Sequence, residues 1–240
     1  MILAAGLGTR LRPLTDTCPK PLIDVGGRPM IAFALDLVRA AGISEVAINL
    51  HHLGDQLRKA LGHGENYGVR FTFFEEDPIL ETGGGISNAR NFLDGDEFVV
   101  LNADTMTDLD LSDTIAFHRR HAALATMFLR PDPEAQRYGT IEIDGEHRIR
   151  RFLGQPAEAG EPLRQLMFGG VHVFSPRVFD YLPSGAYSIT KTTYPRMLQA
   201  EEPLYGYVFD GYWQLLDTPA GLEAGREHVA RRRSAAASST

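Results

Sequence analysis

Two glycines, two arginines and a lysine lie close together near the start of the chain. Residues 1–13 read Met-Ile-Leu-Ala-Ala-Gly-Leu-Gly-Thr-Arg-Leu-Arg-Pro, and Pro-Lys-Pro follows at 19–21. Because glycine has no Cβ, the N–H groups around Gly6 and Gly8 can approach an anion closely and form a concavity that binds it. Guanidinium forks and a lysine point charge suit phosphate oxygens. The stretch predicts a loop that wraps a polyphosphate after a first strand, with Arg10 and Lys20 among its cations.

Two other phosphate loops are excluded by the same residues. The dinucleotide-binding fingerprint needs a third glycine, and the Walker loop needs Gly-Lys-Ser/Thr at the end of a longer span. Here Gly6-x-Gly8 is followed by Thr9, Arg10 and Leu11. A Gly-x-Gly turn alone is equally typical of a tight strand-to-loop connection, so the arginines and the Pro-Lys-Pro segment decide in favour of phosphate binding.

An aspartate ends the apolar run at 98–101, which continues as Asn-Ala-Asp at 102–104. Open α/β folds bind ligands beyond the carboxyl ends of their strands. Mg²⁺ prefers one or two carboxylates together with phosphate oxygens. We therefore expect Asp104 to be a metal ligand, the alternative being an aspartate that starts a turn or caps a helix. Asp108 and Asp110 are expected to open the helix that follows.

Residues 3–21 resemble the signature of the sugar-1-phosphate nucleotidylyltransferases, commonly Leu-Ala-Ala-Gly-x-Gly-Thr-Arg-Leu-x-Pro-Leu-Thr followed by Pro-Lys-Pro. The resemblance extends over residues 2–230. It implies an α/β fold of three α/β/α layers, Rossmann-like and of the glycosyltransferase-A type, with a mixed, mostly parallel sheet in one domain over 1–231. It also implies that an NTP and a sugar 1-phosphate give an NDP-sugar and diphosphate with the help of Mg²⁺.

The resemblance assigns roles to particular residues. Arg10 would stabilise charge on the triphosphate, Lys20 would hold the attacking phosphate or the α-phosphate, and Asp104 would hold Mg²⁺. No covalent intermediate is required. The nucleotide-binding residues implied are Ala4, Ala5, Gly6, Gly8, Thr9, Arg10, Lys20, Thr82, Gly83 and Asn102.

The second metal ligand is expected in the segment 211–219, Gly-Tyr-Trp-Gln-Leu-Leu-Asp-Thr-Pro. Most relatives read Tyr-Trp-x-Asp-Val-Gly-Thr-Pro, so Leu215 stands where their aspartate stands and Asp217 stands at their glycine. Residues 215 and 217 of an extended segment lie on the same side. Asp217 is therefore the predicted second ligand, and the alternative is an N-cap of the last helix.

The segment 81–86, Glu-Thr-Gly-Gly-Gly-Ile, is expected to cradle the nucleobase and ribose, although a flexible turn is the alternative. It resembles a subset that includes N-acetylmuramate-1-phosphate uridylyltransferases and heptose-1-phosphate guanylyltransferases. Our first hypothesis for the substrates is UTP with N-acetylmuramate 1-phosphate. Guanylyl transfer to mannose or heptose 1-phosphate is the competing hypothesis.

Sugar binding is expected at Gly139 and Gly170, which match two family segments whose glycines let the sugar lie against the backbone. Many relatives carry Glu-Lys-Pro, whose lysine holds the sugar phosphate, whereas this chain reads Gly-Gln-Pro at 154–156. Arg150, Arg151 or Lys191 would substitute for that lysine, or each is a surface charge. Because Leu215 and Gln155 depart from the pattern, a non-catalytic nucleotide sensor is a hypothesis of another class.

Composition narrows the remaining possibilities. The net charge of −7 argues against a nucleic-acid partner, and the one cysteine excludes an intrachain disulfide and suits a reducing compartment. No signal peptide and no membrane-length apolar stretch is visible, so we expect a cytoplasmic protein with small-molecule substrates. The oligomeric state is left open. His118 and His121 are expected on a solvated helix face rather than at a zinc site.

These groups must be positioned by alternating strands and helices, a pattern that favours a sheet covered on both faces. Asp-Gly-Glu at 144–146 predicts a hairpin turn. Residues 232–240 are small and polar and predict a disordered tail. Strands are expected at 45–50, 69–75, 98–101, 125–130, 140–144, 149–152, 167–174 and 205–209, and helices at 29–41, 54–61, 83–93, 111–121, 194–199 and 218–231.

Overall fold

A short parallel strand precedes the glycine turn at the start of the chain in the computed structural model. The structure describes residues 1–156 and 162–237. These residues form two units, one made of Met1, 76–101 and 110–211, the other of 2–75, 102–109 and the chain from Tyr212 onward. The single domain expected over 1–231 stays a prediction.

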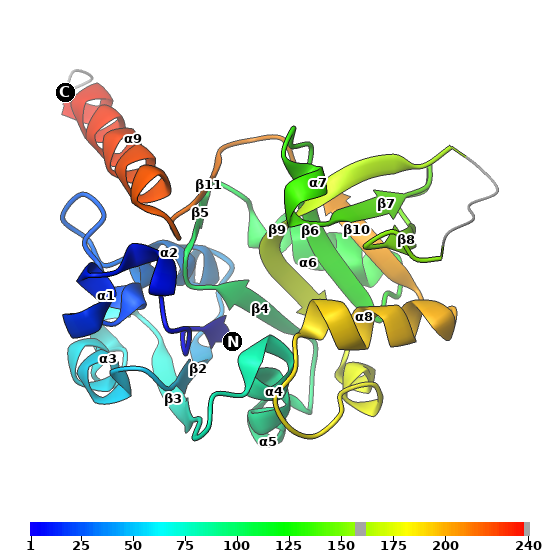
Figure 1. Cartoon of the computed structure of the whole chain (residues 1–240), viewed down its shortest axis with the longest axis horizontal. Helices are drawn as coiled ribbons and strands as arrows, with labels where there is room; N and C mark the ends of the chain where they lie inside the picture. Colours follow the sequence, from blue (N-terminus) through cyan, green and yellow to red (C-terminus); the bar gives the residue numbers. More distant parts are fainter. Residues whose placement is uncertain (157–161, 238–240) are drawn as a thin grey trace. The chain divides into compact units, whose positions relative to one another are not determined.

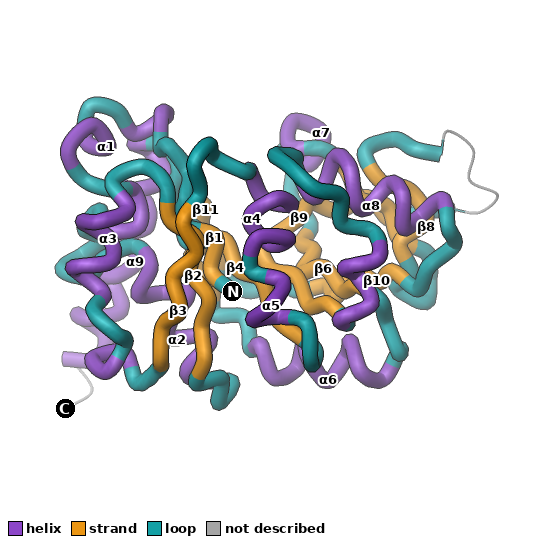
Figure 2. Tube along the Cα trace, turned by 90° about the horizontal axis from the view of Figure 1, so that it is seen from below, coloured by secondary structure: helices purple, strands orange, loops and turns teal. Residues whose placement is uncertain are grey.

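The unit that contains the glycine turn is built on three parallel strands in the order β1 (Ile2–Leu3), β2 (Glu45–Leu50) and β3 (Arg70–Glu75) (Figure 2). Five consecutive residues of β2 are buried, as expected for a parallel strand covered on both faces. The helices of this unit are α1 (Leu14–Thr17), α2 (Ile31–Ala40), α3 (Gly54–Leu61) and α9 (Pro219–Ala237).

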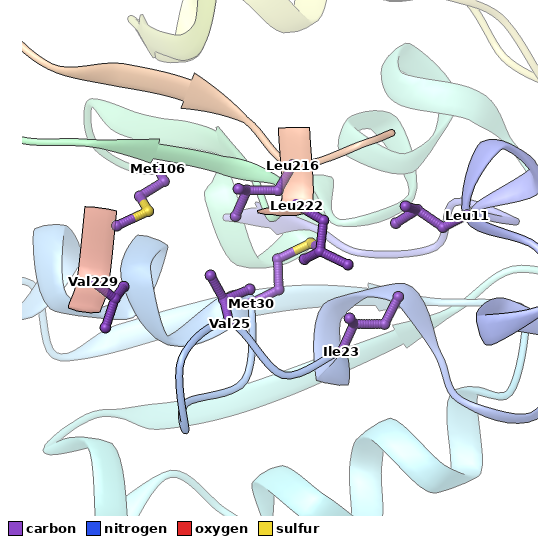
Figure 3. Packing of buried hydrophobic residues seen from close by; sticks show 8 residues of the cluster. All are labelled: Leu11, Ile23, Val25, Met30, Met106, Leu216, Leu222 and Val229. Carbon is purple, nitrogen blue, oxygen red and sulfur yellow. The ribbon is translucent and has the colours of Figure 1, made fainter. Parts of the chain in front are cut away.

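A two-stranded antiparallel ribbon completes this unit. Strand β5 (Thr105–Thr107) pairs with β11 (Trp213–Leu215) (Figure 1). In the register of this pair Leu215 lies opposite Thr105. Apolar side chains anchor the ribbon and α9 in one core cluster (Figure 3), whose buried members are Leu11, Ile23, Val25, Met30, Met106, Leu216, Leu222 and Val229. Neither strand was predicted, because three residues are too few to show a reliable alternation.

The other unit contains a mixed sheet in the order β10-β6-β9-β4. Strand β9 is antiparallel to both β6 and β4, whereas β10 and β6 are parallel. A hairpin of β7 and β8 joins β9 and confirms the predicted turn at 144–146. The elements of this unit are β4 (Phe98–Asn102), β6 (Ala125–Arg130), β7 (Thr140–Ile143), β8 (Ile149–Phe152), β9 (Arg164–Phe174), β10 (Leu204–Val208), α4 (Glu81–Asn88), α5 (Arg90–Leu93), α6 (Leu111–Arg120), α7 (Ala135–Tyr138) and α8 (Ile189–Gln199).

The expected α/β class with a mixed, mostly parallel sheet is confirmed, and most predicted elements agree within a few residues. Helix α8 begins at Ile189 rather than 194, because the chain keeps its helical path through Pro195. Helix α9 continues to Ala237, so residues 232–237 of the predicted disordered tail are helical; its alanines are strong helix formers. Residues 238–240 lie outside the described residues.

Candidate active site

The glycine turn follows β1 directly and is fixed by hydrogen bonds on both sides. The N–H of buried Ala4 donates to Oδ1 of Asn49 at 2.7 Å. Gly8 has a φ of +63°, and a Cβ there would lie 2.6 Å from Cγ2 of Thr15. The Thr15 hydroxyl donates to the Gly8 carbonyl at 2.9 Å. Gly8 is therefore required by the turn itself.

Neither the backbone conformation nor the packing of the described residues requires a glycine at position 6. A Cβ at this exposed residue would meet no atom of the described chain within 4 Å, and its φ is not in the left-handed region. The bare backbone at Gly6 is thus available to a molecule that approaches from solvent. This is the property that the sequence predicts for a phosphate-binding turn.

Arg10 extends from the short 3-10 helix Thr9–Leu11 that ends the turn. Leu11 is 1% exposed and anchors this helix in the core cluster, whereas 61% of the Arg10 side chain is exposed. Its Nη1 lies 2.5 Å from Oδ2 of Asp217, whose side chain is 4% exposed. One predicted phosphate-binding cation thus contacts one predicted metal ligand.

Lys20 and Asp104 form a second pair of this kind. Buried Pro19 and Pro21 flank Lys20, and its Nζ donates to Oδ2 of Asp104 across 84 positions of sequence. The two side chains are 14% and 21% exposed. Asp104 lies in the turn between β4 and β5, so it caps no helix. That role belongs to Asp110, which accepts a 2.7 Å bond from the Ser112 N–H at the start of α6, as predicted.

The ribbon of β5 and β11 brings Asp104 and Asp217 to one end of the same unit. The N–H of Leu216 donates to the carbonyl of Asp104 at 2.8 Å, and the N–H of Ala103 donates to the carbonyl of Leu3 at 3.2 Å. The acidic turn is thereby tied both to β1 and to the residue before Asp217. Sequence reasoning missed this ribbon, although buried Met106 between two threonines is a weak strand signal.

The N-cap alternative for Asp217 is wrong. At the start of α9 the hydroxyl of Thr218 accepts a 3.1 Å bond from the Gly221 N–H, which is the bond that a capping side chain makes. Thr218 therefore caps the helix, and the Asp217 carboxylate is directed to Arg10 instead.

Thr82 and Gly83 lie in the other unit, where helix α4 begins at Glu81, so the flexible turn given as the alternative for 81–86 is wrong. The Gly83 N–H donates to the Tyr187 carbonyl at 2.9 Å, and the Thr82 hydroxyl accepts from the Ile189 N–H at 3.0 Å. A Cβ on Gly83 would lie 2.1 Å from Cε2 of Tyr187. The close approach at this glycine is thus made by the protein's own chain. A nucleotide-binding role for Thr82 and Gly83 stays a prediction.

The predicted sugar-binding glycines both need their conformational freedom. Gly139 and Gly170 have φ values of +96° and +92°. A Cβ on Gly139 would also lie 2.3 Å from Cδ2 of Leu153. These facts explain the glycines without a ligand, so their contact with a sugar stays a prediction. Asn102, the last residue of β4, likewise keeps its nucleotide role as a prediction.

Two of the three cations considered as substitutes for the missing lysine are engaged elsewhere. Arg150 pairs with Asp144 at 2.6 Å, and Arg151 pairs with Glu142 at 2.9 Å. Lys191 is exposed on α8 and forms no ion pair with the described residues. Of the three, Lys191 is the one whose charge is not already paired.

The prediction that His118 lies on a solvated helix face is wrong. This side chain is 1% exposed, and its Nδ1 lies 2.9 Å from the Thr126 hydroxyl. Burial lowers the pKa of His118, which keeps the ring neutral.

Within residues 1–156 and 162–237, no group of three or more His, Cys, Asp and Glu side chains is arranged to hold a metal. Nor has any helix of these ranges the length and apolar character of a membrane span.

Solved structures support the fold class. A protein from Bacillus anthracis named as a glucose-1-phosphate thymidylyltransferase aligns with a TM-score of 0.81 and 24% identity over 94% of this chain and 92% of its own. A UDP-glucose pyrophosphorylase aligns with a TM-score of 0.77 and 20% identity over 96% and 97%. At such identities the likeness shows the fold alone, which is the Rossmann-like, glycosyltransferase-A type expected from the sequence.

Curated relatives are similar at the level of sequence. A UTP–glucose-1-phosphate uridylyltransferase of Synechocystis is 33% identical over 227 residues, 89% of this chain and 58% of the relative. Mannose-1-phosphate guanylyltransferases of Schizosaccharomyces pombe and Mycobacterium tuberculosis are 33% and 31% identical, over 94% and 96% of this chain. The chain spans about three fifths of the length of these relatives, 58% to 64%.

A family model described as nucleotidyl transferase matches residues 1–227, and the chain belongs to this family.

Proposed function

We propose that this protein is a sugar-1-phosphate nucleotidylyltransferase that joins an NTP and a sugar 1-phosphate to give an NDP-sugar and diphosphate. The observation that carries the proposal is the pairing of Lys20 with Asp104 beside a turn whose Gly6 backbone is open to solvent. The names of the curated relatives agree with this reaction class.

The reaction joins two anions, so its main requirements are charge neutralisation and in-line positioning. An oxygen of the sugar phosphate attacks the α-phosphorus, a new P–O bond forms, and the bond to the β-phosphate breaks as diphosphate leaves. In the proposed mechanism Lys20 holds the reacting phosphate. Arg10 stabilises the negative charge that develops on the leaving diphosphate, because a preorganised cation costs no reorganisation during the step.

The carboxylate of Asp104 fits a Mg²⁺ ion. It is an oxygen donor, it is 21% exposed, and its partner Lys20 shows that a cation is accommodated there. Asp217 was predicted as the second ligand and fits less well, because its carboxylate is only 4% exposed. Bound Mg²⁺ would neutralise phosphate charge. Asp104 would be its main protein ligand.

For the substrates, UTP with N-acetylmuramate 1-phosphate stays the first hypothesis, supported by the Glu-Thr-Gly-Gly-Gly-Ile segment and by Gln155 in place of lysine. Guanylyl transfer to mannose 1-phosphate is the second candidate, and it is favoured by the names of several curated relatives. The groups at Thr82 and Gly83 do not indicate which base or sugar binds, because they form hydrogen bonds within the protein.

The deciding experiment is a matrix of nucleotides and sugar 1-phosphates assayed for diphosphate release. We expect turnover with UTP, and turnover with GTP alone would replace the first hypothesis by the second. Nucleotide binding without turnover by any pair would identify the protein as the non-catalytic sensor considered from the sequence, and the proposed enzyme would be rejected.

A further inference from the structure

The Asp217 carboxylate is buried, yet its ion-pair partner Arg10 is mostly exposed. The side chains are 4% and 61% exposed, and Oδ2 of the acid lies 2.5 Å from Nη1 of the guanidinium. A buried carboxylate is costly unless it is paired and hydrogen-bonded. Because the buried carboxylate depends on this ion pair, the pair also restrains the exposed side chain of Arg10.

The backbone around Asp217 is fixed on both sides. Leu216 is fully buried in the core cluster (Figure 3), and its N–H donates to the Asp104 carbonyl at 2.8 Å. On the other side, Thr218 caps α9 through its 3.1 Å bond with the Gly221 N–H. Asp217 thus performs neither the core packing nor the capping of this segment, and it presents its carboxylate from a rigid point.

An exposed arginine has many rotamers, and ordering such a side chain when a ligand binds reduces affinity. A fixed carboxylate orders the guanidinium beforehand. Because the guanidinium has five N–H donors, a contact through Nη1 leaves other donors for phosphate oxygens. From this geometry we infer that Asp217 is a positioning residue that aims Arg10 at the anion on the glycine turn, and that this is its main part in the reaction rather than metal coordination. The inference rests on the proposed phosphate-binding role of the turn.

Positioning and simple charge act in opposite directions, which makes the inference testable. Removal of a negative charge beside the site should by itself strengthen anion binding. Loss of positioning should weaken it. A metal ligand should have no positive role in binding when metal is absent.

The experiment measures binding of inorganic tripolyphosphate and of UTP and GTP by calorimetry in the presence of EDTA. We expect the isosteric Asp217→Asn to bind about 3- to 10-fold more weakly than the wild type, and Asp217→Ala to bind more weakly still. In Arg10→Gln, the further change Asp217→Asn should no longer weaken binding, because the acid positions the arginine and only the effect of its lost negative charge remains. Thermal unfolding verifies that each variant is folded, and Asp217→Asn carries the test if Asp217→Ala is not.

Asp16→Asn is the matched control. Asp16 pairs with Arg12 at 3.2 Å in the segment that follows Arg10, but both side chains are more than half exposed. The substitution removes the same charge, so binding should be unchanged or slightly tighter. A weakening equal to that of Asp217→Asn would mean that any acid paired with Arg10 or Arg12 has the effect, and it would overturn the inference.

Two further outcomes would also overturn it. The first is unchanged or tighter metal-free binding by Asp217→Asn together with a raised Mg²⁺ requirement for diphosphate release, which would make Asp217 a metal ligand. The second is a wild-type protein that binds no tripolyphosphate. A different outcome is a wild type that binds tripolyphosphate but turns over no substrate pair. This result would reject the proposed enzymatic function. The comparison of binding by the wild type and Asp217→Asn would still decide the role of Asp217.

Discussion

At the scale of single residues, Asp104 is the acid whose loss should matter most. We expect Asp104→Asn to reduce diphosphate release by more than about 100-fold, the order of magnitude of a lost preorganised charge contact. Its thermal unfolding should stay close to the wild type, because the side chain is partly exposed and its backbone bonds are kept. Asp108→Asn, an exposed neighbour, is the control and should keep its rate. A fully active Asp104→Asn would remove this residue from the mechanism.

Lys20 supports a parallel prediction at the same scale. Lys20→Ala should lower the rate by at least about 100-fold, since the charge held between two buried prolines is then absent. Lys59→Ala on the exposed side of α3 removes the same charge elsewhere and should have little effect. A mild loss in Lys20→Ala, measured by single-turnover kinetics at saturating substrates, would mean that the lysine serves only to neutralise Asp104.

At the scale of secondary-structure elements, Gly83 of α4 is a packing residue. Gly83→Ala would place a Cβ 2.1 Å from the Tyr187 ring, so we expect the free energy of unfolding to fall by about 1–3 kcal/mol. Gly95→Ala, where a Cβ meets nothing within 4 Å, should change it by less than about 0.5 kcal/mol. Chemical denaturation of both variants checks the difference, and equal stabilities would contradict the packing role.

The elements also show what the sequence can and cannot predict. Helix α2 was predicted within two residues because its apolar residues recur with the helix period, and strand β2 because it is a short, mostly apolar run typical of a strand covered on both faces. Strands β5 and β11 were missed because each has three residues and depends on pairing with a segment about 100 positions away. Lys20 and Asp104 could be predicted as candidate site residues from their motifs. The contact of Asp217 with Arg10 could not, because it depends on the ribbon of β5 and β11.

At the scale of the whole molecule, buried histidines should make stability depend on pH. Burial lowers the pKa of His172 to about 3, whereas an unfolded histidine titrates near 6.5. Between these values the unfolded chain binds a proton that the folded chain does not bind. Stability is therefore fully present above about pH 6.5 and falls as the pH decreases, by about 1.4 kcal/mol per unit for each such group.

The measurement is the free energy of unfolding between pH 3 and 7 for the wild type and His172→Gln. The variant should be less stable at pH 7, because the contact of His172 with the Tyr194 hydroxyl at 2.8 Å is altered, but it should lose stability less steeply on acidification. Parallel curves for the two proteins would exclude His172 as a source of acid sensitivity.

The register of the β5–β11 ribbon has a consequence for how this enzyme family can vary. Leu216 is locked in the interior, Leu215 on one side of it is partly exposed, and the buried Asp217 carboxylate on the other side contacts Arg10. An acid that moves from 215 to 217 shifts along the chain by about 6.6 Å, two strand residues. Two point substitutions would thus relocate a negative charge along this segment while Leu216 keeps the segment anchored in the core cluster.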